Sequence, residues 1–154
     1  MQAQEELRRE ARIEELRRRK HVASAAIEDG RGAVILYTGR HLYLWDGGGI
    51  AAIGTEDALS RPIGQAGSAG HAKAAMAAHA KIAAAEDWII EAAFEQVGAD
   101  DSKMRAVEGP IIDGGLTAAH LQAMLAAAIK AGCEIPARLV MLVRECDALE
   151  REAA

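Results

Sequence analysis

Residues 33–53 read AVILYTGRHLYLWDGGGIAAI, which is three apolar runs separated by two turn sequences. The first two runs, Ala33–Thr38 and His41–Trp45, are rich in β-branched and aromatic residues, and the Gly-Arg pair between them suits a two-residue hairpin turn. Three consecutive glycines precede the third run, Ile50–Ile53. We therefore predict a small antiparallel three-stranded β-meander, which needs helices to cover its apolar face.

The chain before the meander predicts a long N-terminal helix. Residues 3–28 contain no glycine or proline and are dominated by Glu, Arg, Leu and Ala, which favour helices. Their apolar stripe is incomplete, since Ile13 and Leu16 share one face whereas Leu7 and Ala11 point to the opposite side. We expect the second half of this helix to pack on the body and the first half to project as an arm.

Three more helices are predicted after the meander. The first is Ala69–Val97, the second follows the N-cap residue Thr117, and Pro136 opens the third. The segment before the first of these helices, residues 54–70, and the segment after it, residues 98–116, are rich in Gly, Ser, Pro or Asp and are predicted to be loops. The predicted fold class is α+β, with a long N-terminal helix, a three-stranded antiparallel meander and three C-terminal helices.

Apolar positions at helical spacing predict which residues of these helices are buried. On the first helix they are Ala75, Met76, Ile82, Ala83, Ile89, Ile90, Ala93, Phe94 and Val97. On the second they are Leu121, Met124, Leu125, Ala128 and Ile129, and on the third Leu139, Leu142, Val143, Cys146 and Leu149.

Length and composition indicate one ordinary domain. The chain has 154 residues, of which 51% are apolar and only 3% aromatic, with alanine supplying much of the apolar fraction. We expect an arm at residues 1–28, a compact domain at residues 29–150 and a frayed tail at residues 151–154. No apolar run approaches the ~20 residues of a membrane span, and two widely spaced cysteines suit reduced thiols. The expected location is the cytoplasm, without membrane association.

The net charge of −5 argues against a nucleic-acid surface over the whole domain. The charge is unevenly distributed. Residues 1–20 carry seven basic and five acidic groups, whereas residues 21–154 carry 11 basic and 18 acidic groups. The net charge is therefore +2 in the first segment and −7 in the rest.

Two sequence patterns resemble ligand-binding sites, but the residues around them or their spacing do not suit such a site. Gly47, Gly49 and Ala52 match the spacing of a dinucleotide-binding loop, but Gly54 falls inside the helix that should follow, so a β-turn is predicted instead. His79 and Glu86 share the apolar side of one helix, about 10.5 Å apart along its axis, which is too far to chelate one zinc ion unaided. We expect both to be largely buried and metal-free.

No catalytic, cofactor-binding or metal-binding residue is therefore predicted. The predicted function is a non-catalytic interaction protein, an oligomeric structural or accessory component of the kind also found among phage and prophage accessory proteins. It would self-associate or bind another protein through the N-terminal helix. The predicted partner-binding residues are Leu7, Ala11, Ile13, Arg17, Arg18, Arg19 and Lys20.

Two alternatives remain open. The first is a nucleic-acid-associated protein, because the consecutive cations Arg17–Lys20 could hold phosphates. The second is an enzyme whose site assembles from scattered side chains, which would be His41, His79, Glu86 and His120.

Overall fold

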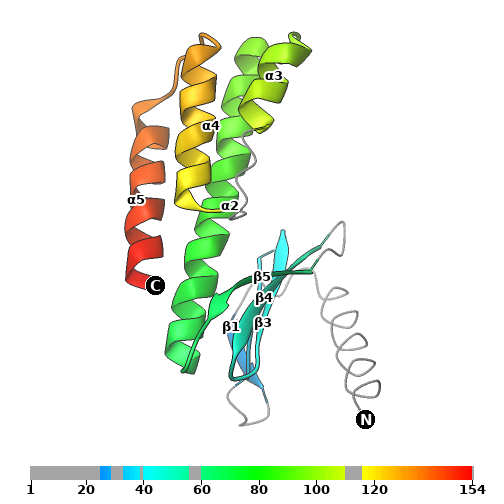
Figure 1. Cartoon of the computed structure of the whole chain (residues 1–154), viewed down its shortest axis with the longest axis vertical. Coiled ribbons are helices and arrows are strands. Elements are labelled where there is room, and N and C mark those ends of the chain that lie inside the picture. The colour runs from blue at the N-terminus through cyan, green and yellow to red at the C-terminus, as the bar shows by residue number, and fades with distance from the viewer. Residues whose placement is uncertain (1–24, 29–32, 39, 56–59, 110–115, 154) are drawn as a thin grey trace. The chain divides into compact units, whose positions relative to one another are not determined.

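The computed structural model describes residues 25–28, 33–38, 40–55, 60–109 and 116–153. The elements in this part of the chain are five strands followed by four helices, an α+β arrangement (Figure 1). The chain divides into two compact units, Met1–Met76 and Ala77–Ala154. The sheet belongs to the first unit, and the long helix α2 begins in the first unit and continues into the second.

The sheet is an antiparallel meander in which every strand pairs with its neighbours in sequence. Its strands are β1 (Ala25–Glu28), β2 (Ala33–Tyr37), β3 (His41–Trp45), β4 (Gly49–Gly54) and β5 (Ser60–Gln65). The predicted three-stranded meander is confirmed as β2, β3 and β4. Gly47, in the turn between β3 and β4, has a positive φ of 106°, and the residues that follow form a strand and not a helix. The glycine-rich segment is thus a β-turn, as predicted.

The predicted N-terminal helix is wrong at its C-terminal end. Ala25–Glu28 form strand β1, which pairs with residues 33–36 of β2. The helix preferences of Ala and Glu amount to only a few tenths of a kcal/mol per residue, which the backbone hydrogen bonds offered by β2 outweigh. The rest of the predicted helix lies outside the described residues.

The predicted loop at residues 54–70 contains the fifth strand. Its sequence, SRPIGQ, is poor in strand formers, which is why the pattern did not reveal it. The strand lies at an edge of the sheet, which is where a proline such as Pro62 is tolerated within a sheet. An irregularity between Ile50 and Ala51 also interrupts its pairing with β4. Both features discourage a further strand from pairing at this edge.

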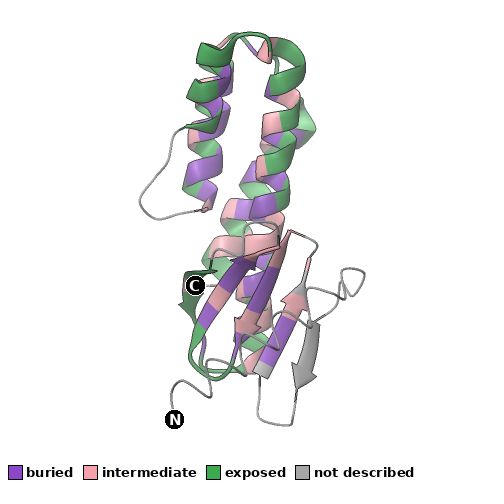
Figure 2. Cartoon of the chain, turned by 90° about the vertical axis from the view of Figure 1, so that its right-hand side faces the viewer, coloured by how far each residue is buried: buried purple, intermediate pink, exposed green. Residues whose placement is uncertain are grey.

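The central strands bury apolar side chains on both faces of the sheet. Trp45 pairs with Val34 on one side and Ile50 on the other, and all three are buried. A separate cluster of buried side chains comprises Ile35, Leu42 and Ile53. The buried positions of the central strands are purple in Figure 2. The indole N–H of Trp45 also donates to the Ala66 carbonyl at 2.9 Å, which holds the segment before α2 against the sheet.

The helices are α2 (Ala69–Val97), α3 (Asp101–Glu108), α4 (Ala118–Lys130) and α5 (Ala137–Ala153). The predicted bounds of α2 are confirmed, and α5, which follows Pro136 as predicted, extends to Ala153. The N-cap of α4 is Thr117, whose side chain accepts a hydrogen bond from the His120 backbone N–H. No helix among the described residues is long and apolar enough to cross a membrane.

Helix α3 corrects the predicted loop at residues 98–116. Asp100 caps it by accepting from the Lys103 backbone N–H, and Met104 and Val107 are its buried residues. These two apolar positions at i and i+3 make too short a stripe to stand out in the sequence. Asp100 is the signal that could have revealed the helix.

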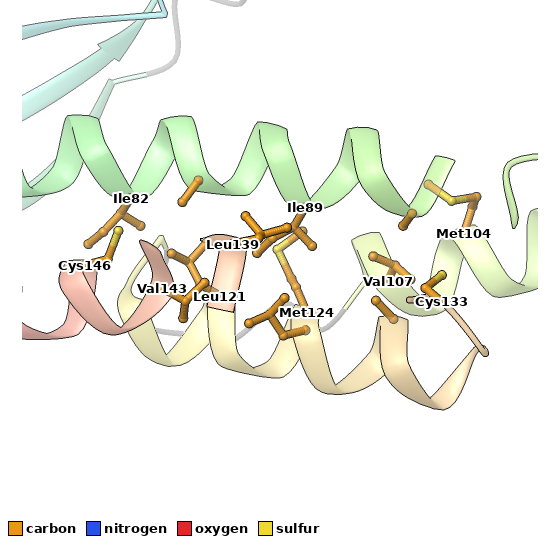
Figure 3. Close-up of a cluster of buried hydrophobic side chains, with 14 residues drawn as sticks. Ile82, Ile89, Met104, Val107, Leu121, Met124, Cys133, Leu139, Val143 and Cys146 are labelled. Carbon is orange, nitrogen blue, oxygen red and sulfur yellow. The ribbon is translucent and has the colours of Figure 1, made fainter. Parts of the chain in front are cut away.

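The second unit has a core built from all four helices. Figure 3 shows Ile82 and Cys146 pointing toward each other between α2 and α5, and Met124 entering from α4. Most positions that the helical spacing marked as buried are confirmed. The core cluster comprises Ile82, Ala85, Ile89, Ala93, Met104, Val107, Leu121, Met124, Leu125, Ala128, Cys133, Leu139, Val143 and Cys146.

Phe94 and Ile129 are exceptions, because their side chains are 62% and 60% exposed. Phe94 directly follows the fully buried Ala93, and Ile129 directly follows the fully buried Ala128. One residue turns an α-helix by about 100°, which is enough to carry a side chain from the core to the surface. The predicted burial of Phe94 and Ile129 is therefore wrong, because the buried arcs are narrower than the apolar stripes.

Gly132 ends α4 in a conformation that other residues adopt at a cost. Its φ is +92°, its N–H donates to the Ile129 carbonyl, and the Cys133 N–H donates to the Ala128 carbonyl. This pair of bonds is a Schellman motif.

Replacing Gly132 with Ala should lower the free energy of unfolding by ~1–2 kcal/mol, because an L-residue is strained at this φ. A methyl group added at Gly70, within α2, would meet no atom within 4 Å. Gly70→Ala should therefore raise the free energy of unfolding by up to ~1 kcal/mol. Urea unfolding of both variants measures the difference. Equal effects of the two substitutions on the free energy of unfolding would contradict the assignment of Gly132 to a position that requires a positive φ.

A second prediction concerns alkaline pH. Burial raises the pKa of Tyr43 well above its usual 10.0, and the Arg40 guanidinium opposes part of this shift. In the unfolded chain Tyr43 loses its proton near pH 10, so above this pH the unfolded state binds fewer protons than the folded state. The stability linked to the neutral phenol is fully present below this pH. It is lost progressively as the pH rises toward the higher pKa of the folded state.

Urea unfolding across this range should show stability falling as pH rises past the unfolded pKa, with a smaller slope in Tyr43→Phe. An unchanged slope in that variant would show that other groups cause the decline.

Candidate functional site

Glu86 and His120 form a largely buried polar contact in the described part of the second unit. Glu86 lies on α2 and His120 in the first turn of α4, and the imidazole Nε2 and a carboxylate oxygen are 3.2 Å apart. The side chains are 17% and 10% exposed, respectively. A carboxylate can only accept, so the imidazole N–H donates. The pair joins two helices at positions that lie 34 residues apart in the sequence.

The N-terminus of α4, beside this pair, is already occupied by groups of the chain itself. The Ala118 N–H donates to a carboxylate oxygen of Glu150 on α5 at 3.1 Å, and the Thr117 hydroxyl accepts from the His120 N–H. A carboxylate at a helix N-terminus is favoured by the helix dipole. The arrangement resembles a set of links between α2, α4 and α5 more than an open anion-binding site.

The structure brings together two of the four side chains considered for an enzyme site. Glu86 contacts His120, a pairing that no sequence spacing could indicate. Glu86 is largely buried, as predicted, whereas His79, seven residues before it on α2, is only partly buried. His41 opens β3 in the first unit, where its ring centroid lies 5.6 Å from that of Tyr43.

No group of three or more His, Cys, Asp or Glu side chains that could hold a metal ion occurs among the described residues. The Glu86–His120 pair alone offers two ligand atoms, one fewer than the protein usually supplies even at an open catalytic zinc site. The chemistry that the pair supports directly is orientation of an imidazole by a carboxylate. A structural bridge between helices needs the same geometry.

Cys133 and Cys146 are both buried and form no disulfide. The wide spacing of the two residues had predicted reduced thiols. Burial raises the pKa of Cys146; Lys81 opposes this shift, whereas Glu145 and Glu150 add to it. A raised pKa leaves little thiolate at neutral pH, so Cys146 is poorly suited to act as a nucleophile.

Along the surface where α2 and α5 meet, two contacts link side chains of the two helices. Lys81 forms an ion pair with Glu145 at 3.0 Å. The guanidinium carbon of Arg138 lies 5.5 Å from the centroid of the Trp88 ring, a cation–π distance.

A third contact lies at the far end of α2. The Gln96 side chain donates to the Glu134 carbonyl at 2.8 Å and accepts from the Glu134 N–H at 2.7 Å. As the residue number increases along α2 from Lys81 to Gln96, the residue number of the contact partner decreases from Glu145 to Glu134. The antiparallel arrangement of the two helices follows from these three contacts together.

Two large apolar side chains remain exposed on this surface. Trp88 is 49% exposed although Arg138 covers part of its ring, and Met141, one turn from Arg138 on α5, is 60% exposed. No sequence pattern had singled this surface out. The available signal was Trp88, which lies seven residues after Lys81 on the polar side of α2. We call the surface the α2–α5 face and define it by Lys81, Ala84, Trp88, Arg138, Met141 and Glu145.

The predicted partner-binding residues of the N-terminal segment, from Leu7 to Lys20, lie outside the described residues. Comparisons of the chain with protein-family models, with curated proteins and with solved structures give no match. A function is therefore inferred from the chain's own residues and their geometry.

We expect Glu86 and His120 to be coupled energetically. Replacing either residue alone with Leu removes a hydrogen-bond partner from the other's largely buried polar group and should cost ~1–3 kcal/mol of stability. The double variant should cost less than the sum, with a coupling of ~0.5–3 kcal/mol. A double-mutant cycle followed by urea unfolding measures this coupling.

The Lys81–Glu145 pair provides the matched control, because its side chains are 39% and 56% exposed. Its coupling should be only ~0–1 kcal/mol. Additive effects at Glu86 and His120 would mean that their contact contributes nothing to stability.

Proposed function

We propose that this chain is a non-catalytic interaction protein, an oligomeric structural or accessory component that works in the cytoplasm. The observation that carries the proposal is the α2–α5 face. Trp88 is 49% exposed and Met141 is 60% exposed on this face, and Arg138 lies over the Trp88 ring. Trp and Arg are enriched among residues that dominate binding energy at protein interfaces. Met adapts its shape to partner surfaces.

The apolar area left exposed at this face supports the same conclusion. A tryptophan side chain can bury ~150–250 Å², and about half of that area stays in contact with water at Trp88. At ~25 cal/mol per Å², covering it would contribute on the order of 2 kcal/mol. The chain has two tryptophans, and the other one, Trp45, is buried. Trp88 is therefore the tryptophan whose exposed area a partner could cover.

The polar constellation fits a structural role better than a catalytic one. Glu86 and His120 contact each other, and the neighbouring helix N-terminus is capped by Thr117 and Glu150. An active site needs a group that reaches the substrate, and these groups are engaged with one another across helices. This supports an interaction role over the enzyme alternative.

The N-terminal segment supplies a second proposed contact region. Its apolar residues Leu7, Ala11 and Ile13 would pack on a partner or a second copy, and the cations Arg17–Lys20 would flank the contact. The net charge of +2 in residues 1–20 complements the −7 of the remaining chain. Contact of these cations with nucleic acid is the competing possibility.

We expect the full-length protein to have a mass above that of a monomer in light scattering. Removing residues 1–20, or replacing both Trp88 and Met141 with Ala, should lower that mass, because each change removes a proposed contact. Ile129→Ala is the matched control for the second change, since Ile129 is equally exposed but lies on α4.

Urea unfolding of the substituted variants should show that the fold persists, because the side chains removed are exposed. A full-length protein that stays monomeric at every concentration and takes up no other macromolecule would overturn the proposed function. Nucleic acid that copurifies with the full-length protein and is lost with residues 1–20 would favour the nucleic-acid alternative.

A further inference from the structure

The charges on the α2–α5 face are arranged in a way that can be matched by a copy of itself. One contact is Lys81 with Glu145, and the other is Arg138 with Trp88. On each helix the two contact residues are seven positions apart, which is about 10.5 Å, or two turns. One end of the face thus presents an exposed carboxylate, and the other end a guanidinium.

We propose that the α2–α5 face binds the same face of a second copy of this chain, related by a two-fold axis. This inference rests on the proposed interaction function and names its partner. The axis would lie between the two faces and cross both helices midway between the two contacts, at about residue 84 on α2 and residue 141 on α5. Two-fold dimers are the commonest symmetric assembly of soluble proteins.

A rotation about this axis exchanges the two ends of the face. Arg138 of one copy then stands opposite Glu145 of the second copy, and the reverse pair forms at the other end. Lys81 of one copy stands opposite Trp88 of the second copy, which offers a second cation for the exposed part of that ring. Every exchanged pair is attractive, so the face is complementary to itself in charge.

The shape of the face supports the same partner. Trp88 and Met141 project from it, whereas Ala84 is an exposed position with a small side chain. About this axis Met141 of each copy meets Met141 of the other, and Trp88 lies about one turn from Ala84 of the other copy, where the small side chain leaves room for the ring. Two antiparallel helix pairs that pack in this way form a four-helix bundle, whose core would receive both apolar side chains.

Charge reversal tests the pairing of Arg138 with Glu145 across the axis. Arg138→Glu and Glu145→Arg should each raise the dimer dissociation constant on the order of 10–100-fold, as measured by analytical ultracentrifugation. The double variant restores opposite charges between the copies and should recover most of the loss. Glu108→Arg, on α3, is the control for a change in net charge and should leave dimerisation unaltered.

The double variant and Glu145→Arg share one repulsion within each copy, between Lys81 and the arginine introduced at position 145. The double variant and Arg138→Glu share the loss of the Arg138–Trp88 contact. Comparing the double variant with both single variants therefore separates the contact between copies from these effects within each copy. Urea unfolding at protein concentrations low enough for the dimer to dissociate checks that the monomers remain folded. A double variant that dimerises no better than Glu145→Arg overturns the two-fold arrangement.

Tryptophan fluorescence provides an independent measurement on the unmodified protein. Trp45 is 6% exposed, so quenching by iodide reports mainly on Trp88. Quenching should weaken as the protein concentration rises, because dimerisation covers the ring. Quenching that does not change with concentration while the protein stays monomeric overturns the inference.

The results separate failure of this inference from failure of the proposed function. If the assembly survives both charge reversals and Trp88→Ala but disappears with residues 1–20, the symmetric face is wrong and the interaction function stands. If only an unrelated protein protects Trp88 from iodide, a second copy is the wrong partner. If no assembly or partner is found at all, both proposals fail.

Discussion

Close approach of helices through alanine is the constraint on which the second unit depends. Ala85, Ala93 and Ala128 are fully buried between helices, where their small side chains let the backbones come near each other. Each alanine buries little apolar area, so a few larger side chains such as Ile89 and Met124 supply much of the hydrophobic stabilisation. Specific links between helices matter more in a core of this kind, because the hydrophobic stabilisation is limited.

Polar and charged side chains supply those links at defined points. Glu86 and His120 join α2 to α4, and Glu150 joins α5 to the first turn of α4. Gln96 holds the backbone of Glu134 through two hydrogen bonds, so the segment between α4 and α5 is fixed against the end of α2. These residue types would suggest chemistry in a sequence. Here their geometry is that of connections within the bundle.

The same constraint explains why the α2–α5 face stands out. An alanine-rich helical unit has few large side chains, and among the described residues Trp88, Phe94, Ile129 and Met141 are not placed in its core. Of these, Trp88 and Met141 share the α2–α5 face. Trp88 is partly covered by Arg138, which contacts the ring but leaves about half of the side chain in water. The unit therefore presents apolar area that a second surface could cover.

The sequence by itself determined the features that depend on local chemistry. The apolar runs of β2, β3 and β4, the glycine turn at Gly47 and the Thr117 cap of α4 involve residues close together in the chain. The tertiary structure decided β1 and β5, since an edge of a sheet can recruit sequences with weak strand preference. It also decided the width of each buried stripe and the contacts of Glu86 with His120 and of Trp88 with Arg138. Local propensity acts over a few residues, whereas these contacts arise because whole helices pack, and no spacing in one sequence specifies which turn of one helix faces which turn of another.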